Sequence, residues 1–125
     1  MISFDLFTIE DGSPIYLQIL RFVKRGIVSG SISDGDELPS RRVLSALLGI
    51  NPNTVQKAYR TLEDEGLIES HSGAKSFVSL QHLAVERVRK ELMDSDIRSA
   101  INALKQSGLS KEEALRIIEQ NWERM

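Results

Sequence analysis

Basic, amide and hydroxyl side chains gather in one short segment between residues 40 and 60. The basic side chains of this segment are those of Arg41, Arg42, Lys57 and Arg60. The amide and hydroxyl side chains that fall among them are those of Asn53, Thr54 and Gln56. The segment contains no acidic residue, so it carries a charge of +4 in a chain whose net charge is −2. Cationic groups bind phosphates and amides can bond to base edges, so these residue types predict a surface for nucleic acid.

Two short helices joined by a turn are expected to position these side chains. Ser40 is a favoured N-cap for the first helix, and Gly49 suits its end because glycine adopts a left-handed conformation easily. The apolar side predicted for this first helix consists of Val43, Leu44, Leu47 and Leu48. Asn51 followed by Pro52 then starts the second helix, since Asn caps well and Pro at the first helical position lacks only a donor that has no partner.

The second helix is predicted to have one buried stripe and an opposite polar face. The stripe, at spacing i, i+3, i+4, i+7, consists of Val55, Ala58, Tyr59 and Leu62. At roughly 100° per residue, Asn53, Lys57 and Arg60 point away from that stripe. This is a helix-turn-helix pattern, which Gly66 closes. A plain helical hairpin with a solvated basic face is the alternative that the pattern leaves open.

A β-hairpin is predicted directly after the second helix. Residues 67–78 hold two short β-prone runs around a loop that contains glycine. A helix-turn-helix followed by a hairpin is a winged helix-turn-helix, and the hairpin tip, or wing, is expected over the backbone or minor groove of a duplex. The candidate wing residues are His71, Gly73 and Lys75.

The N-terminal part of the chain is expected to complete this first domain. Residues 1–12 suit an extended arm whose aromatic side chains dock on the core. Ser13 and Pro14 are expected to cap and open a helix that Gly30 ends. The apolar repeat of that helix is Ile15, Ile19, Val23 and Ile27. Residues 31–37 read as a turn-rich connector.

The C-terminal part, residues 81–125, is predicted to form a dimerisation tail of two amphipathic helices. The join at residues 94–96 marks either a kink or a second start, and Ser110 with Glu113 forms a capping box for the last helix. The candidate interface residues are Leu92, Ile97, Ile101, Leu104, Leu115, Ile118 and Trp122. Packing against the helix of residues 15–27 is the alternative. Spacing favours a core position for both Tyr59 and Trp122. The predicted fold is thus mainly α with a small β-hairpin: a winged helix-turn-helix over residues 1–80, then the tail.

Composition excludes several classes of function. The 125 residues include no cysteine, which removes disulfides and thiolate chemistry and suits a reducing cytoplasm. No apolar run approaches the roughly 20 residues of a membrane span. The two histidines, His71 and His82, lack catalytic or metal-ligating spacing. We therefore expect no enzyme, no cofactor, no metal and no membrane partner.

Residues 14–79 resemble the DNA-binding domain of GntR-family transcription regulators. The residues that carry the resemblance are Pro14–Ile19, Gly30, Gly35, Leu38–Ser40, Arg42, Leu44, Asn51–Val55, Ala58, Tyr59, Leu62, Gly66–Ile68 and Phe77–Val78. The two-helix tail resembles that of the YtrA-like subfamily. The wing departs from the usual Arg-x-Gly-x-Gly-Thr-Phe, because Lys75 stands at the second glycine and His71 at the arginine.

The resemblance implies a homodimeric transcription regulator that binds double-stranded DNA and represses an operon. In many relatives that operon contains transporter genes. It implies a phosphate and base contact for Arg42. The residue types add base contacts for Asn53, Thr54, Gln56 and Lys57, and phosphate contacts for Arg60 and Lys75. Arg41 fits a solvated neighbour or a further phosphate contact. A winged-helix adaptor that binds RNA or protein is the alternative function, and a small-molecule effector has no identity that the sequence reveals.

Overall fold

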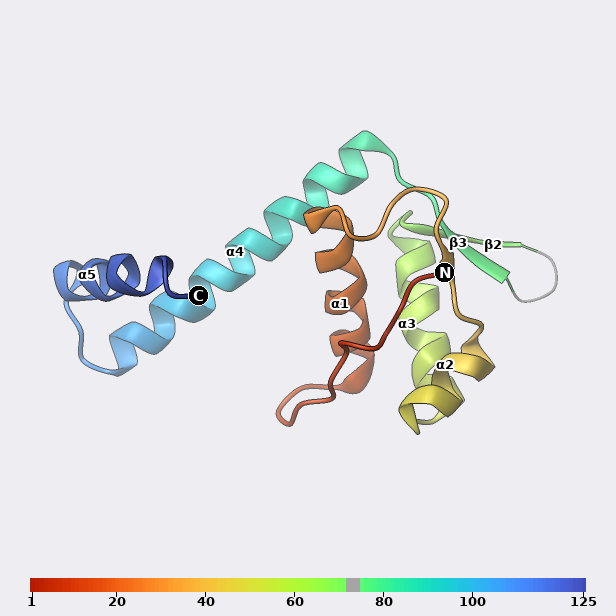
Figure 1. Cartoon of the computed structure of the whole chain (residues 1–125), viewed down its shortest axis with the longest axis horizontal. Helices are drawn as coiled ribbons and strands as arrows, with labels where there is room; N and C mark the ends of the chain where they lie inside the picture. The colour runs from red at the N-terminus through yellow and green to blue at the C-terminus, as the bar shows by residue number, and fades with distance from the viewer. Residues whose placement is uncertain (72–74) are drawn as a thin grey trace. The chain divides into compact units, whose positions relative to one another are not determined.

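The computed structural model describes residues 1–71 and 75–125 of the chain (Figure 1). In these residues the elements follow the order α1 (Ile15–Ser29), β1 (Glu37–Leu38), α2 (Arg41–Leu48), α3 (Pro52–Asp64), β2 (Ile68–His71), β3 (Lys75–Val78), α4 (His82–Gln106) and α5 (Lys111–Trp122). The chain divides into two compact units, Met1–Arg89 and Lys90–Met125. We call the first the winged unit and the second the tail unit. The winged unit includes the start of α4, so it extends nine residues beyond the boundary expected at residue 80.

The core of the winged unit lies between its helices. Helix α3 packs against both α1 and α2, and Figure 1 shows α1 and α3 side by side. The predicted stripe of α3 is fully buried, with Val55, Ala58, Tyr59 and Leu62 all at 0% exposure. On α1 the buried residues include Ile19, Val23 and Ile27. The 3.6-residue spacing thus predicted both core faces, because each helix is long enough to repeat its stripe over several turns.

The predicted caps of α2 and α3 are confirmed. The Ser40 hydroxyl accepts a hydrogen bond from the backbone N–H of Val43 at 3.1 Å. Asn51 Oδ1 accepts one from the backbone N–H of Asn53 at 2.8 Å, with Pro52 at the first helical position. Between the two helices Gly49 has φ of +67°, which only glycine adopts without strain. The turn of the helix-turn-helix is therefore set by local chemistry.

The start of α1 differs from the expectation. Pro14 itself occupies the N-cap position, and no side chain caps the helix. Ser13 lies one residue too early to cap, and its carbonyl instead accepts a hydrogen bond from Gln18 Nε2 at 2.9 Å. The same amide also bonds to the backbone N–H and carbonyl of Glu10, each at 2.8 Å. Gln18 therefore holds the end of the N-terminal arm against α1.

The aromatic side chains of the arm dock on the core, as predicted. Phe4 and Phe7 pack on Phe22 of α1, with ring centroids 4.9 Å and 5.4 Å away. Leu6, however, remains 90% exposed, so the apolar alternation of the arm does not bury every member. The backbone N–H of Ile2 bonds to the carbonyl of Glu37 at 2.7 Å, which ties the arm to β1.

A three-stranded antiparallel sheet in the order β1-β3-β2 completes the winged unit. The hairpin of β2 and β3 is the predicted one, with His71 opposite Lys75. Strand β1 was not predicted, because two residues are too short to show alternation and their pairing to β3 joins distant parts of the chain. It forms just beyond Gly35, in the segment expected to be only a connector. Its Leu38 is 1% exposed and joins the core.

The connector before β1 also packs closely on α1. Ile32 is buried at 6% exposure, and its backbone N–H bonds to the carbonyl of Gly26 at 2.9 Å. A Cβ atom added at Gly26 would lie 2.7 Å from Ile32 Cγ1, well inside van der Waals contact. Gly26 therefore allows the connector to cross the helix closely.

The apolar side predicted for α2 is only half buried. Leu44 is fully buried against the core, but Val43 and Leu47 are 55% and 61% exposed. Adjacent residues differ by roughly 100° around a helix, so a helix that packs along one line buries Leu44 and leaves its neighbour outside. The expectation that all four apolar residues share one buried side is therefore wrong.

The tail contains fewer buried side chains than predicted. Helix α4 runs through residues 94–96 without a break, so no second helix starts there. The capping box of Ser110 and Glu113 is confirmed in both directions. No residue of α5 is buried, and Trp122 is 74% exposed, which contradicts its expected core position within a single chain.

Candidate nucleic-acid interface

Helices α2 and α3 present most of the predicted contact residues on the outside of the winged unit. Arg42, Asn53, Lys57 and Arg60 are exposed, whereas Thr54 and Gln56 are half-buried. Because the opposite stripe of α3 is fully buried, the orientation of this polar face is fixed by the core rather than by its own contacts. This is the geometry of a helix that can enter a groove.

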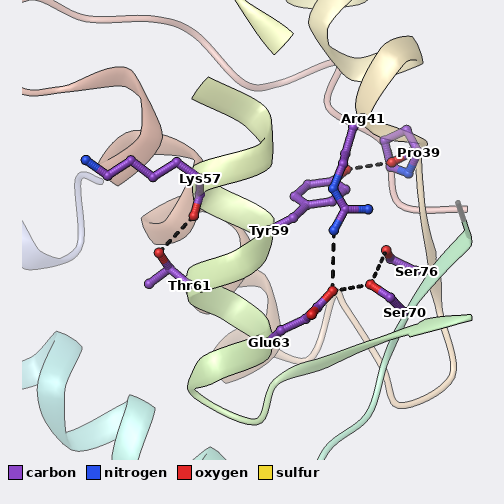
Figure 2. A network of polar contacts seen from close by, with 8 residues as sticks. All are labelled: Pro39, Arg41, Lys57, Tyr59, Thr61, Glu63, Ser70 and Ser76. Atoms are coloured by element: carbon purple, nitrogen blue, oxygen red, sulfur yellow. Dashed lines mark hydrogen bonds and ion pairs between the residues drawn. The ribbon is translucent and has the colours of Figure 1, made fainter. Parts of the chain in front are cut away.

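Arg41 does not join this face. Its guanidinium carbon lies 5.1 Å from the centroid of the Tyr59 ring, and Nη2 pairs with Glu63 Oε1 at 3.3 Å (Figure 2). The sequence count of +4 stopped at residue 60, so it missed the carboxylate one turn further along α3. Arg41 is thus paired within the chain, and a phosphate contact for it stays a prediction.

The ring of Tyr59 supports the Arg41 side chain. Its hydroxyl donates a hydrogen bond to the carbonyl of Pro39 at 2.6 Å. Burial raises the pKa of this phenol, and the smaller opposing effect of the nearby Arg41 charge does not cancel that change. The hydroxyl therefore remains protonated and can remain a donor. In this way Pro39, two residues before α2, is fixed to the middle of α3.

Glu63 extends the same network to the wing. Its Oε1 also accepts a hydrogen bond from the hydroxyl of Ser70 on β2. The Ser70 hydroxyl lies 3.4 Å from that of Ser76 on β3, which is buried at 1% exposure. Figure 2 shows these side chains converging between α3 and the hairpin. The network was not foreseen, because no local pattern relates Glu63 to Ser70.

Lys57 lies against α1 rather than extending freely. Its ammonium nitrogen is 4.0 Å from the centroid of the Tyr16 ring, which is a cation–π contact. The sequence places Tyr16 in the stretch that carries the family resemblance and predicts no role at the site for it. Nothing in the sequence relates the first turn of α1 to one particular side chain of α3.

The described wing residues are exposed. His71 and Lys75 face each other across the hairpin, and the His71 ring packs edge-on against Phe77 at 5.1 Å. His71 Nε2 also lies 3.8 Å from Glu69 Oε2. Gly73, the third predicted wing residue, lies outside the described residues.

The far end of α3 is fixed by charged groups from two other helices. Lys24 of α1 pairs with Glu65 at 2.8 Å, and the side chains of this pair are only 14% and 27% exposed. Arg87 of α4 donates to the Glu65 carbonyl at 2.6 Å. Helix α3 is therefore held along its buried stripe and at its C-terminal end, while its N-terminal turns remain accessible.

The described part of the chain contains neither a candidate metal centre nor a candidate membrane span. No group of three or more histidine or acidic side chains lies close enough together there to hold a metal ion. None of the helices described combines the length and apolar character that crossing a bilayer requires.

Comparison with known proteins matches residues 15–78 to the family of bacterial regulatory proteins called the gntR family. The chain belongs to the GntR family. A relative from Bacillus subtilis, the uncharacterized HTH-type transcriptional regulator YhcF, is 31% identical over 106 residues, which are 85% of this chain and 88% of YhcF. The HTH-type transcriptional repressor YtrA of the same organism is 43% identical over 70 residues, 56% of this chain and 54% of YtrA.

Solved structures support the same assignment. A GntR-family transcriptional regulator from Listeria monocytogenes has a TM-score of 0.76 and 28% identity, covering 90% of this chain and 98% of that one. The structure of AraR(DBD) in complex with operator ORX1 has a TM-score of 0.50 and 27% identity, covering 58% of this chain and 88% of that one. The predicted family and winged fold are thus confirmed, and the family is one of transcription regulators rather than enzymes. The roles of individual residues stay predictions.

Proposed function

We propose that this GntR regulator is a cytoplasmic repressor that binds an inverted repeat in double-stranded DNA as a homodimer. The observation that carries the proposal is the fixed, outward-facing polar side of α3 in a chain of this family. Repression is supported by the similarity to YtrA, a protein described as a repressor. We propose that its target is an operon. The resemblance to YtrA-like regulators favours an operon of transporter genes.

The proposed contacts follow the exposure of the side chains. Asn53, Thr54 and Gln56 lie in the first turns of α3, where amides and a hydroxyl can reach base edges. We propose that Arg42 and Arg60 bind phosphates on either side of the groove that α3 enters. Lys57 rests on the Tyr16 ring, so we propose a phosphate contact for it rather than the base contact expected from the sequence.

The wing supplies the second set of proposed contacts. We propose that His71, Gly73 and Lys75 lie along the backbone beside the groove that α3 enters. Lys75 carries a full positive charge and is exposed on β3, so it suits a phosphate.

The homodimer is proposed from the apolar surface of the tail unit. Its exposed apolar side chains include Ile97, Ile101, Leu115, Ile118 and Trp122, at 40% exposure or more. Leu104 is half-buried, and Leu92 is only 8% exposed, so it has little surface to offer a partner. One recognition helix contacts few base pairs. A dimer with twofold symmetry, bound to two half-sites about 10 base pairs apart, therefore recognises a longer DNA sequence.

Selection of genomic fragments of the source organism by the purified protein tests this function. The expected result is enrichment of an inverted repeat upstream of an operon, with affinity that falls steeply as salt rises. Equal binding to RNA duplexes, or no nucleic-acid binding at low salt, would favour the adaptor function instead. Transcription from the enriched promoter, measured with and without the protein, separates repression from activation.

A small-molecule effector of unknown identity remains a proposal. A cavity of about 720 Å³ lies between the N-terminal arm and α1, lined in part by Phe7, Phe22 and Arg21. A thermal-shift screen identifies a ligand, and loss of the shift in Arg21→Ala places it in this cavity. A ligand whose shift is unchanged in that variant binds elsewhere.

A further inference from the structure

We propose that Glu63 and Ser70 are positioning residues that hold Lys75 of the wing where it meets DNA. The inference rests on the proposed function, because it assumes that the wing contacts a duplex. It assigns a task to two residues of a polar network, neither of which is among the predicted contact residues.

The first step is that one carboxylate oxygen joins the two parts of the interface. Glu63 Oε1, on the last turns of α3, receives both the Arg41 guanidinium of α2 and the Ser70 hydroxyl of β2. Figure 2 shows the chain of contacts from Pro39 through Tyr59, Arg41 and Glu63 to the wing serines. Helix α3 and the wing are therefore linked through side chains as well as through the backbone that connects them.

The second step is that the anchor of this link is fixed by the core. Tyr59 is fully buried, and its hydroxyl bonds to the Pro39 carbonyl. Arg41 lies on that ring with its side chain 23% exposed, and its Nε is buried. Arg41 can thus hold Glu63 in one place and offset a negative charge that would otherwise repel phosphates.

The third step is where the link meets the hairpin. Strand β2 leaves the core after Ile68, since the next three residues of the strand are exposed. Ser70 lies within that exposed part and pairs with Ser76 in the hairpin register. The neighbouring pair in the same register is His71 with Lys75. The contact with Glu63 therefore fixes the hairpin at the pair next to His71 and Lys75.

The fourth step is the consequence for binding. Without the Ser70 contact, the hairpin keeps its ladder and its buried base, but its outer half loses a tether to α3. Lys75 then spends less time against a phosphate, so fewer counterions are released on binding. Loss of one phosphate contact lowers the slope of log affinity against log salt by about 0.9.

The test measures this slope for the full chain on a mixed-sequence 30-base-pair duplex. Ser70→Ala is expected to weaken binding several-fold and to lower the slope by about 0.9, matching Lys75→Ala. Ser70→Thr keeps a hydroxyl and should restore the wild-type slope. The matched control is Ser79→Ala, because the Ser79 hydroxyl bonds to Glu69 within the hairpin at 3.2 Å and makes no link to α3 through that bond.

The combined variant distinguishes positioning from a general effect on folding. In a Lys75→Ala background, Ser70→Ala should change neither affinity nor slope further. A wild-type slope for Ser70→Ala, or an equal loss with and without Lys75, would overturn the inference. A wild-type protein that fails to bind the duplex, or binds with no salt dependence, would instead overturn the proposed function.

Discussion

At the scale of single residues, Tyr59 shows how one side chain serves both the core and the interface. Its ring fills the space under α2, its hydroxyl bonds to Pro39 and its face supports Arg41. The sequence predicted the burial from spacing alone. The two polar tasks were not predictable, because both partners belong to the segment that precedes the turn.

The raised pKa of Tyr59 leads to a prediction about stability at high pH. The folded-state pKa lies above the unfolded value of 10.0, so the protonated phenol contributes stability that is fully present below pH 10. That contribution is lost as pH rises from 10 toward the folded-state pKa. Urea unfolding between pH 9 and 11 should therefore show a loss of stability that is smaller in Tyr59→Phe. A parallel decline in both proteins would contradict the burial of the phenol.

Substitutions of Asn53 and Arg42 distinguish base recognition from phosphate binding. Asn53→Ala should lose about 1–3 kcal/mol of discrimination at one base pair while leaving affinity for scrambled DNA unchanged. Arg42→Ala should weaken specific and scrambled duplexes more nearly alike and lower the salt slope by about 0.9. Competition binding with single-base variants of the selected operator measures both effects. Equal loss on all sequences for Asn53→Ala would reassign it to the backbone.

At the scale of elements, prediction succeeded where a structure depends on neighbouring residues. The caps at Ser40, Asn51 and Ser110 were predicted because each bond spans two or three residues. The hairpin was predicted because its two runs adjoin. Strand β1 was not, since a two-residue strand is defined only by its distant partner β3.

The same distinction holds for the candidate site. Exposure of Asn53 and Arg60 followed from the stripe of α3 and needed no tertiary knowledge. The pairing of Arg41 with Glu63 and the contact of Lys57 with Tyr16 depend on how α2 and α1 pack on α3. Charge counted along the sequence therefore overstated the charge that this part of the surface presents.

The contact between α1 and α3 can be tested through Tyr16. Tyr16→Phe keeps a ring under the Lys57 ammonium, whereas Tyr16→Leu removes it, and such a contact contributes roughly 0.5–1 kcal/mol at an exposed site. If the ring holds Lys57 toward a phosphate, Tyr16→Leu should weaken duplex binding about two- to fivefold and Tyr16→Phe should not. The loss should vanish in a Lys57→Ala background. Equal losses for Phe and Leu would assign the effect to the Tyr16 hydroxyl instead.

At the scale of the whole molecule, the two units differ in how they use apolar residues. The winged unit buries the apolar stripes of α1 and α3 within one chain, whereas α5 of the tail unit buries none of its residues. Ala84 and Val88 of α4 are buried, and Arg87 bonds to the end of α3. A chain cut at residue 80 would lose these three residues, whereas a cut after Arg89 follows the boundary between the two compact units.

A chain ending at Arg89 should fold as a monomer, while the full chain should be a dimer. The physical reason is that the exposed apolar side chains of the tail are removed and the buried ones of the winged unit are kept. Light scattering at micromolar concentration gives the molar mass of each. Ile118→Asp in the full chain serves as a second variant, since a charge on an exposed apolar face disfavours association without emptying a core. A truncated chain that still dimerises would move the interface to the winged unit.

The close crossing of Ile32 over Gly26 limits how this protein can be engineered. Replacing a helical glycine with alanine ordinarily stabilises a helix by about 1 kcal/mol, so Gly26 is an obvious target for raising thermal stability. Here the new methyl group would press on the buried Ile32 side chain, and overpacking costs typically 1–3 kcal/mol. We expect Gly26→Ala to lower the melting temperature, and Gly26→Ala with Ile32→Val to recover part of the loss. Helix propensity thus favours alanine at position 26, but that substitution first requires a smaller side chain than that of Ile32 beside it.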